Sequence, residues 1–318
     1  MPHEYEMIPT GSYPCLNLFL VRLQSRCPHL HRELELGLIL EGRLTLRHAG
    51  QGYRLEKDEF YLVNSMKPHE FTSVGEGTLV LAVQVSPRFL EPFIPDASMH
   101  CFQVKPPLEP FFPKGSEKAR ELREAVLDLA VHYLSAGGED AMTCFYLLSR
   151  LLLLLDRNLP RQVLTQNDYE MMRRQTDRMV SILDEIDRHF QQKLLLEDIA
   201  REYGLTMPYV SHLFKNILGI SFQEYLKEKR FEHALELLNT TSKTILDIAI
   251  ESGFSDLRYM TKAFREKYGC TPKEYRRQHP SLLQSTRSSA ENRQELLHPE
   301  ESLPIVRELL GTVPDLEE

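Results

Sequence analysis

The chain has 318 residues, of which 42% are hydrophobic and 26% charged, with a formal net charge of −8. These values are ordinary for a globular protein and argue against a disordered or fibrous chain. The most apolar stretch, 145–155, is interrupted by Ser149 and Arg150 and is too short to span a bilayer. The N-terminus lacks a secretory signal pattern. Five scattered cysteines without a CxxC pair favour neither a disulfide framework nor a zinc site, so we expect a cytoplasmic protein outside the membrane.

The first part of the chain has the pattern of short strands. Runs such as LNLFLVRL, LELGLILEG and TLVLAVQV lie within residues 16–85, and Gly, Pro, Asn or charged clusters separate them. Short strands at this spacing predict an antiparallel sandwich or barrel. Residues 86–115 are rich in Pro and Phe and are expected to form an irregular covering segment. We assign residues 1–115 to one domain.

Helical patterns follow this domain. Ser116 is a candidate N-cap for a first helix, and a second helix is expected over about 140–157. The leucine run 151–155 covers more than one face of that helix, which suits either core packing or a helix–helix dimer contact. The expected divisions are a helical dimerisation segment (116–160), a polar linker (161–176), a helical domain (177–279) and an acidic, disordered tail (280–318) with a short helix at Ile305–Leu310.

Residues 177–279 contain an internal repeat. Asp198-Ile199-Ala200 matches Asp247-Ile248-Ala249, and Phe214-x4-Gly219 matches Phe264-x4-Gly269 about fifty residues later. Each copy reads as a helix, a turn containing glycine and a second helix. This pattern is typical of a helix-turn-helix unit, which places its second helix in the DNA major groove. One long helix capped by Ser221 is expected to join the copies; reading helices in successive grooves would lie about 34 Å apart.

The second helix of each copy has one apolar and one polar stripe. We expect Val210, Leu213, Phe214 and Ile217, then Tyr259, Met260, Ala263 and Phe264, to face the core. The exposed stripes are expected to be Pro208, Ser211, His212 and Lys215 in the first copy, and Leu257, Arg258, Thr261, Lys262 and Arg265 in the second. Most of these side chains donate to base edges or phosphates. Residues 191–279 hold 14 Lys and Arg against 12 Asp and Glu, so a mildly basic module lies within an acidic chain.

Residues 190–277 resemble the DNA-binding domain of the AraC/XylS transcription regulators, above all through ILDIAIESGFSDLRYMTKAFREKYGCTPKEYR. The resemblance implies a seven-helix domain in which a linker helix joins two helix-turn-helix units. It implies base-reading roles for Pro208, Ser211, His212, Leu257, Arg258 and Lys262, and phosphate contacts for Lys215 and Arg265. Pro208 and Leu257 are poor donors, so those two positions would give only apolar contacts with thymine methyl groups.

The first domain resembles a cupin. His29, His31, Glu35 and Gly42 have the spacing of the first cupin motif, although its leading Gly is Leu23 here. In the second motif, Asp58, Asn64 and Met66 replace Gly, Pro and Gly ahead of His69. In metal-binding cupins, residues at the positions of His29, His31, Glu35 and His69 hold one divalent ion such as Fe, Mn, Ni or Zn. The alternatives are a small-molecule effector pocket lined by some of these residues, or a purely structural role; no other cofactor is expected.

Together these features predict an α+β protein: a cupin-like antiparallel β-barrel followed by helices, and an all-α C-terminal domain with two helix-turn-helix units. We expect no enzyme but a sequence-specific regulator of transcription. It would bind double-stranded DNA as a homodimer, respond to a small-molecule effector, and contact RNA polymerase if it activates. The alternatives are a metal-dependent cupin enzyme attached to DNA-binding helices, and a constitutive DNA-binding dimer without an effector.

Overall fold

The computed structural model describes residues 13–311 apart from 14, 49–50, 76, 93–95, 136–140 and 279–292. The chain divides into two compact units. The barrel unit comprises Glu6–Arg173 and Gln294–Glu318, and the helical unit comprises Met1–Tyr5 and Arg174–Arg293. Within the described ranges, every helix is too short or too polar to span a lipid bilayer.

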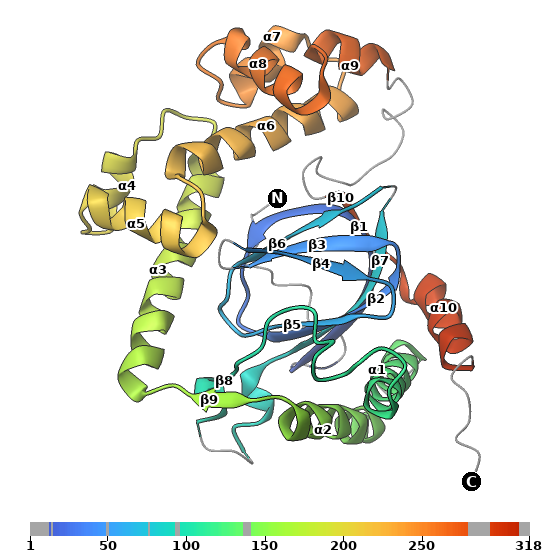
Figure 1. Ribbon diagram of the computed structural model, residues 1–318. Helices are drawn as coiled ribbons and strands as arrows, with labels where there is room; N and C mark the ends of the chain where they lie inside the picture. Colours follow the sequence, from blue (N-terminus) through green and yellow to red (C-terminus); the bar gives the residue numbers. More distant parts are fainter. Residues whose placement is uncertain are drawn as a thin grey trace. The chain divides into compact units, whose positions relative to one another are not determined.

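The barrel unit is built on an eight-stranded sheet. Seven strands lie in the order β4-β3-β6-β1-β7-β2-β5, and each of their pairings is antiparallel. Their bounds are β1 (Leu16–His29), β2 (Leu34–Glu41), β3 (Arg43–His48), β4 (Gln51–Glu56), β5 (Phe60–Val63), β6 (His69–Ser73) and β7 (Thr78–Val85). The sheet curls into a nearly closed barrel (Figure 1). The predicted α+β class and the cupin-like barrel are confirmed.

Several strands of the barrel, above all β2, β5 and β7, bury residues on both of their faces. On β1, Leu18 and Leu20 belong to an outer core shared with helices, whereas Val21 and Leu23 belong to a core inside the barrel. The same alternation holds on β5, where Leu62 faces outward and Tyr61 inward. Successive side chains of a strand point to opposite faces, so these strands read as nearly continuous apolar runs.

Helices cover the outer core. Helix α1 (Glu117–Ser135) begins where Ser116 Oγ accepts a hydrogen bond from the Ala119 amide at 3.2 Å, as its predicted N-cap role requires. In helix α2 (Ala141–Asn158), four leucines of the run 151–155 are buried, whereas Leu153 is 46% exposed. The run therefore serves core packing and leaves one position at the surface. Short elements η1 (Pro87–Phe89), η2 (Ala97–Met99), β8 (His100–Phe102) and β9 (Arg161–Val163) connect the barrel and the helices.

The tail expected to be disordered over 280–318 is ordered over residues 293–311, and its expected short helix at Ile305–Leu310 is part of a longer helix. Strand β10 (Arg293–Leu296) pairs with β1, and the Leu297 amide donates to the Leu20 carbonyl at 3.0 Å. Helix α10 (Pro299–Gly311) follows, and its Val306 is fully buried in the outer core. The acidic composition of the tail hides a few apolar residues that complete this core. Residues 279–292 and 312–318 lie outside the described part of the chain.

The helical unit ends with a run of helices that includes both predicted repeats (Figure 1). Helix α3 begins at Gln166 and continues across the division between the units. Residues 166–176 of the predicted linker are therefore helical. The helices are α3 (Gln166–His189), α4 (Leu196–Glu202), α5 (Met207–Leu218), α6 (Phe222–Thr240), α7 (Ile245–Glu251), α8 (Leu257–Tyr268) and α9 (Pro272–Gln278). The all-α domain with two helix-turn-helix units is thus confirmed.

Candidate nucleic-acid interface

The two helix-turn-helix units match closely in length and in the chemistry of their ends. Helices α4 and α7 each have 7 residues, and α5 and α8 each have 12. Both second helices end at a glycine in the left-handed region, Gly219 with φ 73° and Gly269 with φ 68°. Left-handed backbone at a helix C-terminus favours glycine, which has no Cβ to strain. The predicted repeat is therefore a repeat of structure.

Helix α5 presents the first predicted set of polar residues. Thr206 caps it by accepting a hydrogen bond from the Tyr209 amide, and Val210, Leu213 and Phe214 are buried. The opposite side carries the four predicted residues: Pro208, His212 and Lys215 are exposed, and Ser211 is half-buried. This face offers a hydroxyl, an imidazole and one ammonium group to a ligand.

Helix α8 presents the second set and is more strongly basic. Met260, Ala263 and Phe264 are buried, whereas Arg258, Lys262 and Arg265 are exposed and Thr261 is half-buried. Two expectations change. Tyr259 is 61% exposed and does not face the core, because the stripe starting at Met260 already fills it. Leu257, expected outside, is partly buried and packs against the core of this unit.

A depression of about 550 Å³ lies on this face of α8, lined by Leu257, Arg258, Thr261, Lys262, Arg265 and Glu266. Two acidic residues that sequence reasoning did not assign to this face bond its basic side chains. Glu266 Oε1 lies 3.8 Å from Lys262 Nζ, and its Oε2 accepts from Lys227 Nζ at 2.9 Å. Asp256 Oδ2 lies 2.7 Å from Arg258 Nη2. The i, i+4 spacing of Lys262 and Glu266 could have indicated the first pair.

The acidic partners have lowered pKa values. The pKa of Asp256 lies below its ordinary value because its carboxylate accepts hydrogen bonds from the side chain and amide of Arg258. The pKa of Glu266 is lowered by the hydrogen bond from Lys227. Both carboxylates are ionised at neutral pH, so they partly neutralise the basic face of α8 before any ligand binds.

Helix α6 links the two helix-turn-helix units rigidly. Ser221 and Glu224 form a capping box at its start, as the Ser221 cap predicted in part. Phe222 packs edge-on against Phe214 of the first unit, and Phe231 lies 4.8 Å from Phe264 of the second, between ring centroids. Buried Lys229 bonds Asp187 of α3 at 3.0 Å. Helix α6 thus shares a core with both α5 and α8.

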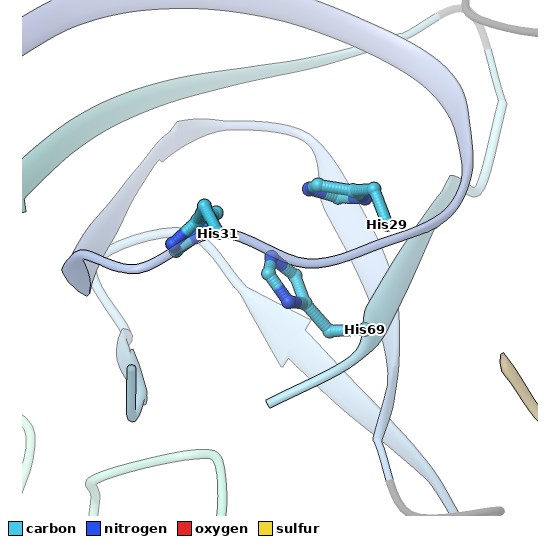
Figure 2. A group of neighbouring side chains, drawn as sticks. All are labelled: His29, His31 and His69. Atoms are coloured by element: carbon cyan, nitrogen blue, oxygen red, sulfur yellow. The ribbon is translucent and has the colours of Figure 1, made fainter. Parts of the chain in front are cut away.

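Inside the barrel, the predicted histidine cluster is brought together (Figure 2). One nitrogen from each of His29, His31 and His69 lies within 4.8 Å of the others, and all three side chains are buried. His29 pairs with His69 across β1 and β6. Glu35 is also buried, and its carboxylate accepts hydrogen bonds from Tyr61 at 2.8 Å and Gln84 at 2.9 Å.

Hydrogen bonds assign different protonation states to the cluster. His69 Nδ1 donates to the Lys67 carbonyl at 3.0 Å, so Nε2 carries the lone pair, and this buried atom has no hydrogen-bond partner among the described residues. Burial lowers the pKa of His69 to about 3, so its ring is neutral. His31 contacts two acceptors, the Glu33 carbonyl at 3.0 Å and Glu35 Oε2 at 2.9 Å, and satisfies both only with two ring protons. Burial alone would raise the pKa of Glu35, but the hydrogen bond and charge of His31 lower it.

These residues fit a divalent metal ion in part. The neutral His69 ring donates from Nδ1 to a backbone carbonyl, which fixes the ring orientation as in a metal-binding histidine. His31 and Glu35 are hydrogen-bonded to each other, so a metal bound by His29, His31 and His69 requires this hydrogen bond to break. The Tyr61 ring lies so close to Gly37 that a Cβ there would come within 2.1 Å of it, so a larger residue does not fit at position 37.

The second cupin motif keeps its backbone shape despite its substitutions. Asp58 and Met66, which stand where the motif has glycine, both have left-handed backbone, with φ 68° and 59°. Such conformations are uncommon outside glycine. The turn geometry of the motif is therefore maintained by residues that are strained in it.

Comparisons with known proteins match both units. Residues 199–278 match a helix-turn-helix domain family, and residues 21–85 match the cupin domain family. A solved structure of the C-terminal domain of the response regulator yesN from Fusobacterium nucleatum is 35% identical over 31% of this chain and 98% of its own, with a TM-score of 0.30. The apo form of a ToxT variant from Vibrio cholerae is 13% identical over 84% of this chain and 98% of its own, with a TM-score of 0.41.

Relatives in sequence are regulators. The HTH-type transcriptional regulator ExsA of Pseudomonas aeruginosa is 24% identical over 78% of this chain and 87% of its own length. An uncharacterized HTH-type transcriptional regulator of Staphylococcus aureus is 23% identical over 86% of this chain, which spans only 36% of that relative's length. The chain therefore carries a helix-turn-helix domain of the AraC type behind a cupin domain.

Proposed function

We propose that this chain regulates transcription by binding specific DNA sequences through α5 and α8. The observation that carries the proposal is the pair of 12-residue helices, fixed on one linker helix, whose exposed sides hold donors for bases and phosphates. We expect the protein to act in the cytoplasm. The named relatives are transcriptional regulators, which favours this function over an enzymatic one.

Roles within the reading helices follow from side-chain chemistry. We assign contacts with base edges to Ser211, His212, Arg258, Thr261 and Lys262. Lys215 and Arg265, one turn farther along each helix, are assigned to phosphates. Pro208 and Leu257 can offer only apolar contacts with thymine methyl groups.

Selection of bound fragments from a random DNA pool tests the proposal. The full chain is expected to enrich a defined sequence, and its affinity for that sequence should fall steeply with salt, because phosphate contacts release counterions. A pool that stays random at every protein concentration would contradict the proposal. Repeating the selection with candidate metabolites tests control by an effector. Such control requires that the effector favour one arrangement of the protein over another.

We also propose that helices within 116–160 form a homodimer. On α2, Met142, Tyr146 and Leu153 are 79%, 65% and 46% exposed, and their spacing places them along one side of the helix. Tyr146→Glu and Leu153→Glu are expected to convert a dimer into a monomer in light-scattering measurements. If the variants keep the molar mass of a dimer in solution, this surface is not the dimer interface. If the protein activates transcription, the DNA-bound dimer would also contact RNA polymerase.

A second candidate function is metal binding by the barrel, favoured by the buried Nε2 of His69, which no described residue hydrogen-bonds. A divalent ion there would be held by His29, His31 and His69, and would supply Lewis-acid or redox chemistry to a cupin enzyme or a metal-dependent regulator. Elemental analysis of the purified protein tests this. Stoichiometric iron, manganese, nickel or zinc that is lost in His69→Ala supports it, and equal metal content in both proteins contradicts it.

A further inference from the structure

Asp256 has two functions at the start of α8. Its Oδ1 accepts a hydrogen bond from the Arg258 amide at 2.7 Å, which caps the helix. Its Oδ2 accepts from Arg258 Nε at 2.9 Å and from Arg258 Nη2 at 2.7 Å. A single carboxylate therefore fixes both the helix end and the guanidinium group two residues later.

The Asp256–Arg258 pair leaves one edge of the Arg258 guanidinium group available to a ligand. The side chain of Arg258 is 89% exposed, and a guanidinium group has five N–H donors in a planar fork. Asp256 engages the edge formed by Nε and Nη2. The neighbouring edge carries one N–H of Nη1 and the second N–H of Nη2, and two parallel donors of this kind match O6 and N7 of guanine.

We propose that Asp256 is a specificity-determining residue that positions Arg258 to read a guanine base. This inference rests on the proposed DNA-binding function. Holding the side chain before binding reduces the conformational freedom that is lost on binding. The negative charge of Asp256 also repels phosphates, so Arg258 is directed toward a base edge and away from the DNA backbone.

The first unit has no such pair. Fifty positions earlier, Thr206 occupies the place of Asp256 and Pro208 the place of Arg258. Thr206 caps α5 through a neutral hydroxyl, and Pro208 has no side-chain donor. An arginine held by a carboxylate is thus found at this position only in the second unit. Thr206, at the position that matches Asp256, provides a control for substitutions of the cap.

Asp256→Asn separates capping from positioning, because asparagine is as good an N-cap as aspartate but lacks the charge. The experiment measures the affinity of the full chain for the sequence that wild type selects, for each single base change in it, and for unrelated DNA. For Asp256→Asn we expect the ratio of preferred to altered affinity to fall about 5- to 20-fold at one guanine only. Affinity for unrelated DNA should stay the same or increase. Thr206→Asn should leave all ratios unchanged.

Arg258→Ala should abolish the preference at that guanine, and adding Asp256→Asn to Arg258→Ala should change nothing further there. The proposal is overturned if Asp256→Asn weakens all sequences alike, if it leaves the guanine preference intact, or if the two substitutions act additively. The readout is a ratio from one preparation, so a partly unfolded sample does not alter it. If wild type selects no sequence at all, the proposed function fails, and this inference fails with it.

Discussion

Helices α5 and α8 share three buried positions, the fourth, seventh and eighth of their 12 residues, and α5 also buries its twelfth, Leu218. Their exposed positions differ: Pro208, His212 and Lys215 in the first unit correspond to Arg258, Lys262 and Arg265 in the second. Packing against a core limits which residues fit, whereas an exposed face is limited only by what it binds. The comparison therefore separates the positions that build a reading helix from those that choose its ligand.

The turns of the two units differ in another way. Gly204 and Gly253 are both left-handed, with φ 61° and 77°. A Cβ on Gly204 would meet nothing within 4 Å, whereas one on Gly253 would lie 2.7 Å from the carbonyl oxygens of Phe190 and Gln191. The first turn needs glycine for its backbone conformation alone. The second needs it also because the segment after α3 passes directly over it.

Substituting the two glycines should give the largest difference between the units. Gly253→Ala is expected to destabilise the second unit by about 3 kcal/mol, because strain from left-handed backbone adds to a clash with backbone atoms. Gly204→Ala should cost about 1 kcal/mol, from the conformation alone. Hydrogen exchange of the α7, α8, α4 and α5 amides measures each unit separately within the full chain. Equal protection losses in both variants would show that the contact over Gly253 is unimportant.

Substituting the matching second residue of each reading helix should affect specificity unequally. Arg258→Ala is expected to reduce affinity for the selected sequence about 5- to 150-fold and to relax the preference at one base pair. Pro208→Ala, at the matching position, should change affinity less than about 3-fold, because proline offers only an apolar contact. Titration of labelled DNA checks both values. A larger loss for Pro208→Ala would reverse the assignment of roles.

The first helices of the units differ in capping. Thr244 caps α7 by accepting from the Asp247 amide at 3.2 Å, whereas Leu195 at the start of α4 provides no side-chain cap. Thr244→Ala should destabilise the second unit by about 1 kcal/mol, and Leu195→Thr should stabilise the first by a smaller amount. Chemical denaturation followed by circular dichroism measures both. Destabilisation by Leu195→Thr would mean that the lost packing of Leu195 outweighs the gain from a side-chain cap.

The smallest difference is expected at the phosphate positions. Lys215→Ala and Arg265→Ala should each weaken binding to all DNA sequences and reduce the slope of log affinity against log salt by about 0.9. Matching effects in both variants would support equal docking of the two helices on the DNA backbone. An unchanged slope for either variant would remove that residue from the phosphate contacts.

The repeat could be predicted because its signals are local. Turn glycines and apolar residues at helical spacing lie within a few residues of one another and define α4, α5, α7 and α8. Polar N-caps mark the start of all of these helices except α4. The cluster of His29, His31, Glu35 and His69 was also found, from the spacing of a known motif. The hydrogen bonds from Tyr61 and Gln84 to Glu35 were not, since strands distant in sequence supply those partners.

Other features lacked a local signal. Strand β10 has only 4 residues and no alternation, and its pairing partner β1 lies far away in the sequence. The first turns of α3 are polar and exposed, so they resemble a linker in sequence. The bonds from the Arg258 side chain to Asp256 depend on the rotamer of an exposed arginine, which no local sequence pattern indicates.

The central claim is that two matched helices on one rigid linker read neighbouring major grooves. Methylation interference at guanine N7, measured on the sequence that the full chain selects, tests it most directly. We predict two groups of interfering guanines on one face of the DNA, about 10 base pairs apart for each protein subunit, with Arg258→Ala weakening one group only. A single continuous group, or interference that Arg258→Ala reduces equally everywhere, would contradict the account.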